Sequence, residues 1–125
     1  MKGNFCHIEI TVPDGEKAKD FYSVFGWKFQ TDETGYTMVD TGAEPGGGIF
    51  VPGQGQGPQM GVTVYINTEC INCSLEEINA KGGKTIVPRS PIGAEPNNMG
   101  WFAVFSDPFG NVLGLYEPNP DWKPG

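Results

Sequence analysis

Few residues of this chain have side chains that could do chemistry, and two of them lie close together near the N-terminus. His7 is the only histidine, and Glu9 follows it by two positions. On a strand, that spacing puts both side chains on the same face. A histidine near a carboxylate can act as an acid/base pair at neutral pH. The alternative is a histidine that lines a pocket beside a solvated carboxylate, and for Glu9 we favour this alternative.

Three cysteines form a second group of chemically active residues. Cys70 and Cys73 form a CxxC pair at the expected start of a helix, where a thiol pKa can be lowered, and Cys6 lies apart from them. An odd number of cysteines does not make a disulfide framework, and there is no second CxxC to complete a zinc site. The sequence therefore predicts reduced thiols in a cytosolic protein.

Length and charge restrict the class of partner. The chain has 125 residues, enough for one domain, and a formal net charge of −7. This charge disfavours nucleic acids and anionic membranes, because both attract basic surfaces. The sequence contains no apolar run of transmembrane length, and residues 1–4 resemble no signal peptide. We therefore expect a cytoplasmic protein that binds a small molecule.

The first half of the chain predicts a strand, a helix and three more strands. Alternating side chains indicate a strand at residues 5–12. An apolar stripe from Ala18 to Phe25 then predicts a helix, with Asp14 as its N-cap and Gly26 as its stop. The three further strands are predicted at residues 27–30, 36–40 and 48–51.

The second half repeats this order. Residues 53–58, GQGQGP, have the composition of a linker. A strand at 62–66 and a helix from Ile71 to Gly82 follow it, and then strands at 84–87, 101–105 and 111–117. One ungapped offset of 56 places His7 on Thr63 and Gly26 on Gly82. The repeated order predicts a duplication of one βαβββ unit.

The two ends of the chain resemble a known superfamily. The opening HIEITVPDGEKAKDFYSVFGWKF and the closing GWFAVFSDPFGNVLGLYEP are similar to glyoxalases, bleomycin resistance proteins and extradiol dioxygenases of the vicinal oxygen chelate superfamily. The resemblance implies an α+β fold with two βαβββ modules in tandem, each sheet curled into half of a cup. It implies one domain over 1–125, with modules at 4–52 and 59–118, and a homodimer.

The resemblance also implies four metal-ligand positions, and only one of them carries a usual ligand. His7 occupies the first position, while Thr63 (or Val62, with a slip of one residue) stands at the second. The carboxylate positions of the two last strands fall on Gly48 and Gly114. Such sites need several N or O ligands, so we predict no metal cofactor. Glu9 could still complete a partial site with His7.

The two glycines admit two interpretations, which are a deeper pocket or the bending of a sheet. The predicted inward row is His7, Glu9 and Thr11 in the first module and Thr63, Tyr65 and Asn67 in the second. Trp101 is expected nearer the mouth of the cup, with plain core as its alternative, and Arg89 falls in a long loop at residues 88–100. The predicted ligand-binding residues are His7, Glu9, Phe50, Thr63, Tyr65, Trp101, Gly114 and Tyr116.

The sequence thus leaves two functions open. The first is a metal-independent small-molecule binding protein, with its ligand held in the cup between paired modules. Aromatic and polar side chains of the kind predicted here are typical of small-molecule pockets, and the negative charge suits a cationic ligand. The alternative is an enzyme of lyase, isomerase or dioxygenase type that uses His7 with Glu9 as metal ligands or as an acid/base pair.

Overall fold

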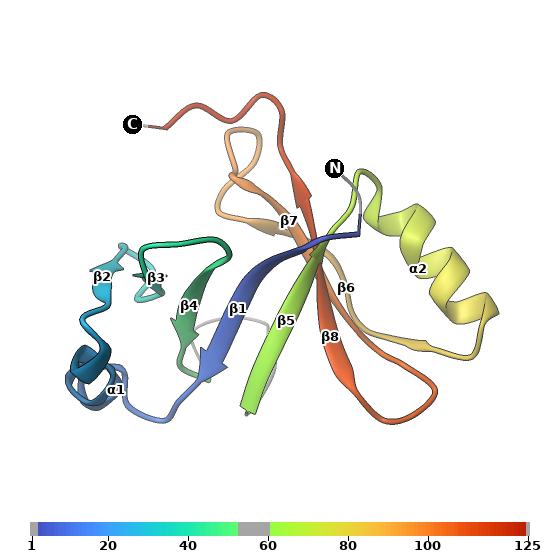
Figure 1. The fold of residues 1–125 in the computed structure, drawn as a ribbon. Helices are drawn as coiled ribbons and strands as arrows, with labels where there is room; N and C mark the ends of the chain where they lie inside the picture. Colours follow the sequence, from blue (N-terminus) through green and yellow to red (C-terminus); the bar gives the residue numbers. More distant parts are fainter. Residues whose placement is uncertain (1–2, 53–60, 125) are drawn as a thin grey trace. The chain divides into compact units, whose positions relative to one another are not determined.

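The computed structural model describes residues 3–52 and 61–124, so the predicted linker at 53–58 lies outside the described residues. Two series of elements follow one another in the same order (Figure 1). The first is β1 (Phe5–Thr11), α1 (Gly15–Tyr22), the 3-10 turn η1 (Ser23–Phe25), β2 (Lys28–Thr31), β3 (Thr37–Asp40) and β4 (Gly46–Phe50). The second is β5 (Gly61–Asn67), α2 (Ile71–Ala80), β6 (Lys84–Ile92), β7 (Gly100–Ser106) and β8 (Val112–Pro118). The predicted α+β fold of two βαβββ modules is confirmed.

Strand pairing is the same in both modules. β1 runs parallel to β4, and β4, β3 and β2 then pair antiparallel. In the same way β5 runs parallel to β8, and β8, β7 and β6 pair antiparallel. Glu9 lies opposite Gly48 and Tyr65 lies opposite Gly114, so the offset of 56 relates structurally equivalent positions. The predicted duplication is confirmed at the level of register.

The chain forms two compact units, which comprise residues 5–64 and residues 65–125 with 1–4. The start of the chain joins the second unit by strand-like hydrogen bonds. The N–H of Gly3 donates to the carbonyl of Asn67 at 2.8 Å, and the N–H of Asn67 donates to the carbonyl of Asn4 at 2.9 Å.

Both helices begin where the sequence predicts, but α1 ends at Tyr22, before the predicted stop at Gly26. The Asp14 carboxylate accepts hydrogen bonds from the N–H groups of Glu16 and Lys17 at 3.0 and 3.1 Å, so it is the N-cap of α1. Gly26 and Gly82 end the helical segments with φ of +77° and +97°, a region that favours glycine. The apolar stripe beyond Tyr22 continues as η1 rather than as α-helix.

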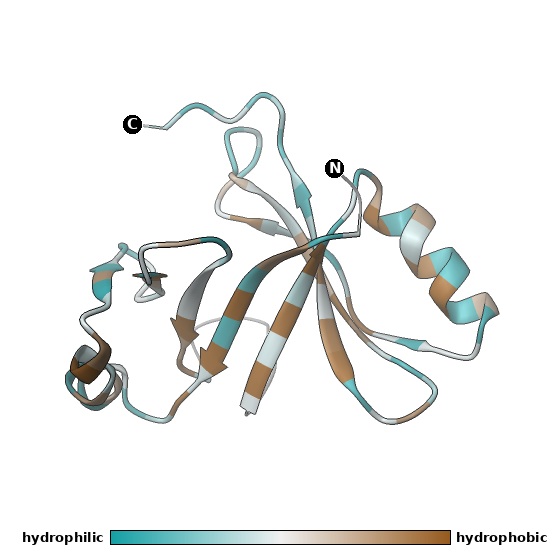
Figure 2. Ribbon diagram, in the orientation of Figure 1, coloured by the Kyte–Doolittle hydropathy of each residue, from teal (hydrophilic) through white to brown (hydrophobic). Residues whose placement is uncertain are grey.

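Each sheet buries one face against its own helix. In the first unit, Ala18 of α1 packs with Val39 and Ile49, and partly buried side chains surround them. In the second, Ile71 and Leu75 of α2 pack against β7 and β8. Alternating apolar and polar bands along β1 and β5 show that only one face of each strand is apolar (Figure 2). We call the sheet face opposite the helix the inner face of that unit.

β6 is longer than predicted and takes up the first five residues of the expected loop at 88–100. The strand runs through Pro88 and Pro91 to Ile92, with register shifts after Thr85 and Val87. Proline is tolerated in edge strands and at bulges, and β6 pairs only with β7 in its sheet. Among the helices in the described ranges, neither is long and apolar enough to span a membrane.

Candidate functional site

The inner face of the first unit carries a chain of three hydrogen-bonded side chains. His7 and Glu9 point from β1, and Tyr36 lies directly before β3. The His7 Nε2 atom lies 2.7 Å from the Tyr36 hydroxyl, which donates to Glu9 Oε1 at 2.9 Å. Glu9 is only 5% exposed, so the expectation of a solvated carboxylate is wrong. Burial of this carboxyl group is tolerated because it accepts a hydrogen bond from Tyr36.

Tyr36 also occupies the space beside Gly48. A Cβ atom at Gly48 would overlap the hydroxyl and the ring carbons of Tyr36. The tyrosine hydroxyl therefore stands where a ligating side chain at this position would begin. No local pattern in the sequence indicated this contact, because Tyr36 is 29 positions from His7 and 12 from Gly48.

The second unit uses its equivalent glycine in the same way. A Cβ atom at Gly114 would overlap the ring of Tyr65, which is 6% exposed. Neither glycine thus opens an empty pocket within its own unit. Each allows a tyrosine ring to lie against the strand at a carboxylate position.

Burial determines the charge of His7. Its Nε2 atom shares a hydrogen bond with the Tyr36 hydroxyl, and which of the two atoms donates depends on the histidine tautomer. Burial lowers the pKa of His7 to about 4, so the imidazole is neutral at pH 7.

The donors at the four implied ligand positions do not fit a divalent metal. These positions carry one imidazole, one threonine and two glycines. Tyr36 and Tyr65 fill the space beside the two glycines. Across residues 3–52 and 61–124, no three His, Cys, Asp or Glu side chains gather in a way that could hold an ion.

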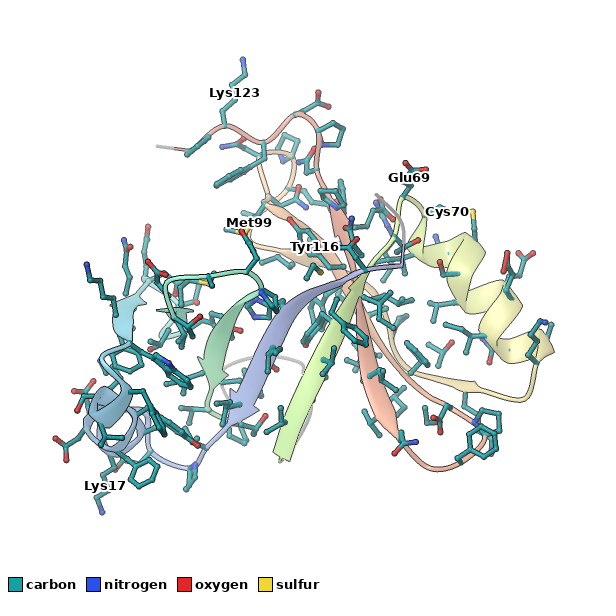
Figure 3. The ribbon with its side chains drawn as sticks, viewed as in Figure 1. Lys17, Glu69, Cys70, Met99, Tyr116 and Lys123 are labelled. Atoms are coloured by element: carbon teal, nitrogen blue, oxygen red, sulfur yellow. A yellow bond between two sulfur atoms is a disulfide. The ribbon has the colours of Figure 1, made fainter. Side chains whose placement is uncertain are left out.

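The other predicted site residues divide between the two units. His7, Glu9 and Phe50 share the inner face of the first unit, because Glu9 and Thr11 lie opposite Gly48 and Phe50. Tyr65, Gly114 and Tyr116 share the inner face of the second, and Thr63 precedes Tyr65 by two positions on β5. The Tyr116 hydroxyl donates to the Met99 carbonyl at 3.4 Å, and Figure 3 labels both residues.

Trp101 does not lie on the inner face, so that prediction is wrong. Its side chain packs on the core beneath α2, opposite Glu117 on β8. Alternation along β7 determines this outcome, since Trp101 has the same parity as the core residues Ala103 and Phe105. Its indole N–H donates to Glu95 at 3.0 Å.

Arg89 is held by an ion pair rather than directed at a ligand. Its Nη2 and Nε atoms donate to the Glu117 carboxylate at 2.9 and 3.3 Å, and its guanidinium lies 4.0 Å from the centre of the Trp101 ring. The N–H of Ile71, at the start of α2, also donates to Glu117 at 2.9 Å. Glu117 thus points away from the inner face, as its parity predicts.

The pKa of Glu117 reflects this environment. Burial of the carboxyl acts to raise its pKa, but the hydrogen bonds from Arg89 and Ile71 and the charge of Arg89 outweigh it. The pKa is therefore below its usual value. The ionised Glu117 carboxylate stabilises the fold. This stabilisation is fully present above the usual carboxyl pKa and is lost as the pH falls through the lowered pKa.

Replacing Glu117 by glutamine is expected to lower the free energy of unfolding by about 2 kcal/mol at pH 7, because the half-buried Arg89 loses its charged partner. Urea unfolding at pH 7 and at pH 3 measures the effect. The difference from the unaltered protein should decrease as the pH falls through the lowered pKa of Glu117. Glu76→Gln, at an exposed position of α2, is the control. Equal losses in the two variants would contradict the structural role of the ion pair.

The prediction of three reduced cysteines is wrong for two of them. Cys70 and Cys73 are joined in a disulfide. Cys70 is the N-cap of α2 and Cys73 lies in its first turn, and residues three apart at a helix start come close to one another. Cys6 lies outside this disulfide, and burial raises the pKa of its thiol.

Comparison with known proteins agrees with this architecture. Residues 4–42 match a family described as bleomycin resistance protein-like N-terminal. A glyoxylase-like domain-containing protein of Didymella fabae is 32% identical over 125 residues, a match that covers 92% of this chain and 94% of the relative. The chain belongs to this glyoxalase-like family, within the vicinal oxygen chelate superfamily.

Solved structures show the same fold at low sequence identity. A hypothetical protein of Bacillus halodurans aligns with a TM-score of 0.70 and 17% identity, over 99% of this chain and 100% of that one. Methylmalonyl-CoA epimerase of Mycobacterium tuberculosis aligns with a TM-score of 0.63 and 14% identity, over 94% and 89% of the two chains. An extradiol ring-cleaving dioxygenase of B. fuscum gives 0.65 and 16%, over 94% of this chain and 34% of that one.

Proposed function

We propose that this protein is a metal-independent small-molecule binding protein and that it holds its ligand on the inner face of the first unit. The observation that carries the proposal is the position of Tyr36. Its hydroxyl fills the place of a ligating side chain at Gly48 and is bonded to both His7 and Glu9. His7 and Glu9, the two side chains that could ligate a metal, are thereby hydrogen-bonded to Tyr36.

The chemistry of this face suits a cationic ligand with an apolar part. Glu9 supplies a buried acidic side chain on a chain whose net charge is −7. Phe50 lies beside Thr11 and supplies an apolar surface. The Thr11 hydroxyl is buried and has no hydrogen-bond partner within the described part of the chain, so a ligand that bonds to it would remove an energetic cost.

The relatives support a small-molecule partner. The N-terminal family is named for bleomycin resistance, and one of the solved epimerases is in complex with methylmalonyl-CoA. Small-molecule sites on this fold are therefore known, although a fold by itself does not determine which ligand is bound.

Calorimetric titration of zinc, nickel, iron(II) and manganese into chelator-treated protein tests the proposal. We expect no stoichiometric binding, because His7 is the one usual ligand among the four positions. A separate fluorescence titration with ethidium, in the presence of chelator, should show binding that Glu9→Gln weakens about tenfold.

The controls distinguish charge from shape. Anilinonaphthalene sulfonate, an aromatic anion, should bind more weakly than ethidium, and Thr11→Val should affect hydrogen-bonding ligands more than ethidium. Tight binding of a metal that is lost in His7→Ala would contradict metal independence. Preference for the anion would contradict the assignment of a cationic ligand.

A second candidate function is acid/base catalysis by the same three side chains. The favouring observation is that His7 is neutral and is connected to Glu9 through the Tyr36 hydroxyl, as a proton relay requires. Methylmalonyl-CoA in deuterated water is the first substrate to test. Deuterium exchange at its α-carbon that is lost in Tyr36→Phe would favour catalysis over simple binding.

A further inference from the structure

The Cys70–Cys73 pair lies at the start of α2 and has no part in the proposed binding function. Cys70 is half-buried and Cys73 is exposed. The N–H of Cys73 lies 3.1 Å from the Cys70 sulfur and donates to it, so this sulfur is the cap of the helix. Figure 3 shows Cys70 at this end of α2. The two sulfurs therefore differ in access and in hydrogen bonding.

The duplication shows what kind of group this position carries. With the offset of 56, Cys70 corresponds to Asp14 and Cys73 to Lys17. Asp14 caps α1 through its carboxylate, which accepts from the N–H of Lys17 at 3.1 Å. The first unit thus places an anion where the second unit places the Cys70 sulfur. A thiolate at Cys70 would reproduce the charge as well as the hydrogen bond of Asp14.

The charged groups around this helix end allow such an anion. Glu117 also accepts a hydrogen bond at this end, from Ile71, but Arg89 compensates its charge in a two-point ion pair. Glu69, the residue before Cys70, is exposed, so solvent screens its charge. The N-terminus of α2 itself favours a thiolate at its cap.

We propose that Cys70 and Cys73 form a redox-active pair that exchanges electrons with dithiol reductants. A thiolate of the reductant attacks the exposed Cys73 sulfur, the S–S bond breaks, and its electron pair leaves on Cys70 as a thiolate. The second thiolate of the reductant then attacks its own sulfur in the mixed disulfide. It closes a cyclic disulfide and releases Cys73, which takes a proton from water. The pair gains two electrons and the reductant loses two.

Reaction of the folded protein with glutathione, a monothiol, identifies which sulfur is attacked. A Cys6→Ser variant is used so that the pair holds the only cysteines. After an acid quench and alkylation, peptide mapping should find glutathione on Cys73 and the alkyl group on Cys70. Millimolar dithiothreitol without denaturant should then reduce the pair completely, and removal of dithiothreitol in air should restore the disulfide.

Thiol pKa values give an independent measurement. In Cys6→Ser/Cys73→Ser, the pH dependence of alkylation should give Cys70 a pKa below the usual value of about 8.5. The matched variant Cys6→Ser/Cys70→Ser should give a higher value for Cys73. Glutathione on Cys70, resistance of the folded protein to dithiothreitol, or the reverse order of pKa values would overturn the proposal. These results do not depend on small-molecule or metal binding, so the proposed function is tested separately.

Discussion

Replacing Gly48 by alanine should lower the free energy of unfolding by about 3 kcal/mol, although alanine is otherwise the better strand residue. The added Cβ overlaps the Tyr36 hydroxyl and ring, so the ring must move away. That movement breaks the hydrogen bonds to His7 and Glu9 and leaves a buried carboxylate with one donor fewer. Denaturant unfolding monitored by circular dichroism measures the loss.

Gly46→Ala is the matched control. Gly46 lies on the same strand and the same face, but a Cβ there meets only the Val39 carbonyl, at 3.8 Å. This variant should unfold within about 0.5 kcal/mol of the unaltered protein. In a Gly48→Ala background, Tyr36→Ala should relieve most of the strain, because it removes the ring that the new methyl group meets. Equal stability of Gly48→Ala and Gly46→Ala would show that Tyr36 does not occupy the space beside Gly48.

Lowering the pH from 6.5 to 4 should destabilise the protein by up to about 3 kcal/mol through His7 alone. The folded pKa of His7 is about 4 and its ordinary value is 6.5, because burial disfavours the charged ring. Between these values the unfolded chain binds a proton that the folded chain does not. Stability therefore falls as the pH falls across this interval and is unaffected by His7 above it.

Comparison with His7→Gln isolates this effect. A glutamine amide can still donate to Tyr36, but it does not titrate. Urea unfolding at pH 7, 5.5 and 4.5 should show a steeper loss in the unaltered protein than in the variant. Parallel pH profiles would show that His7 is as readily protonated in the folded state as in the unfolded chain. That outcome would also remove the argument for a neutral imidazole in the acid/base alternative.

Local sequence patterns determined most of the architecture. Alternation placed His7 and Glu9 on the face opposite the core, and the capping residue Asp14 and the glycines at 26 and 82 located the helix ends. The offset of 56 predicted the equivalent registers of the two modules. These features depend on residues within a few positions of one another, or on a repeat of the same pattern, so the sequence alone carries them.

Contacts between distant positions were decided by the tertiary structure. The hydroxyl of Tyr36 reaches His7 across 29 positions, and no local pattern marks a tyrosine that will lie against a particular glycine. Trp101 was assigned to the wrong face because the sequence does not show which face of β7 the helix covers, and Trp101 shares its parity with the core residues Ala103 and Phe105. The disulfide was missed because the number of cysteines indicates only the redox state expected of the compartment. Whether a disulfide forms depends on how close the two sulfurs lie. Side-chain alternation is a local property of the backbone, but occupation of a space depends on which strands meet there.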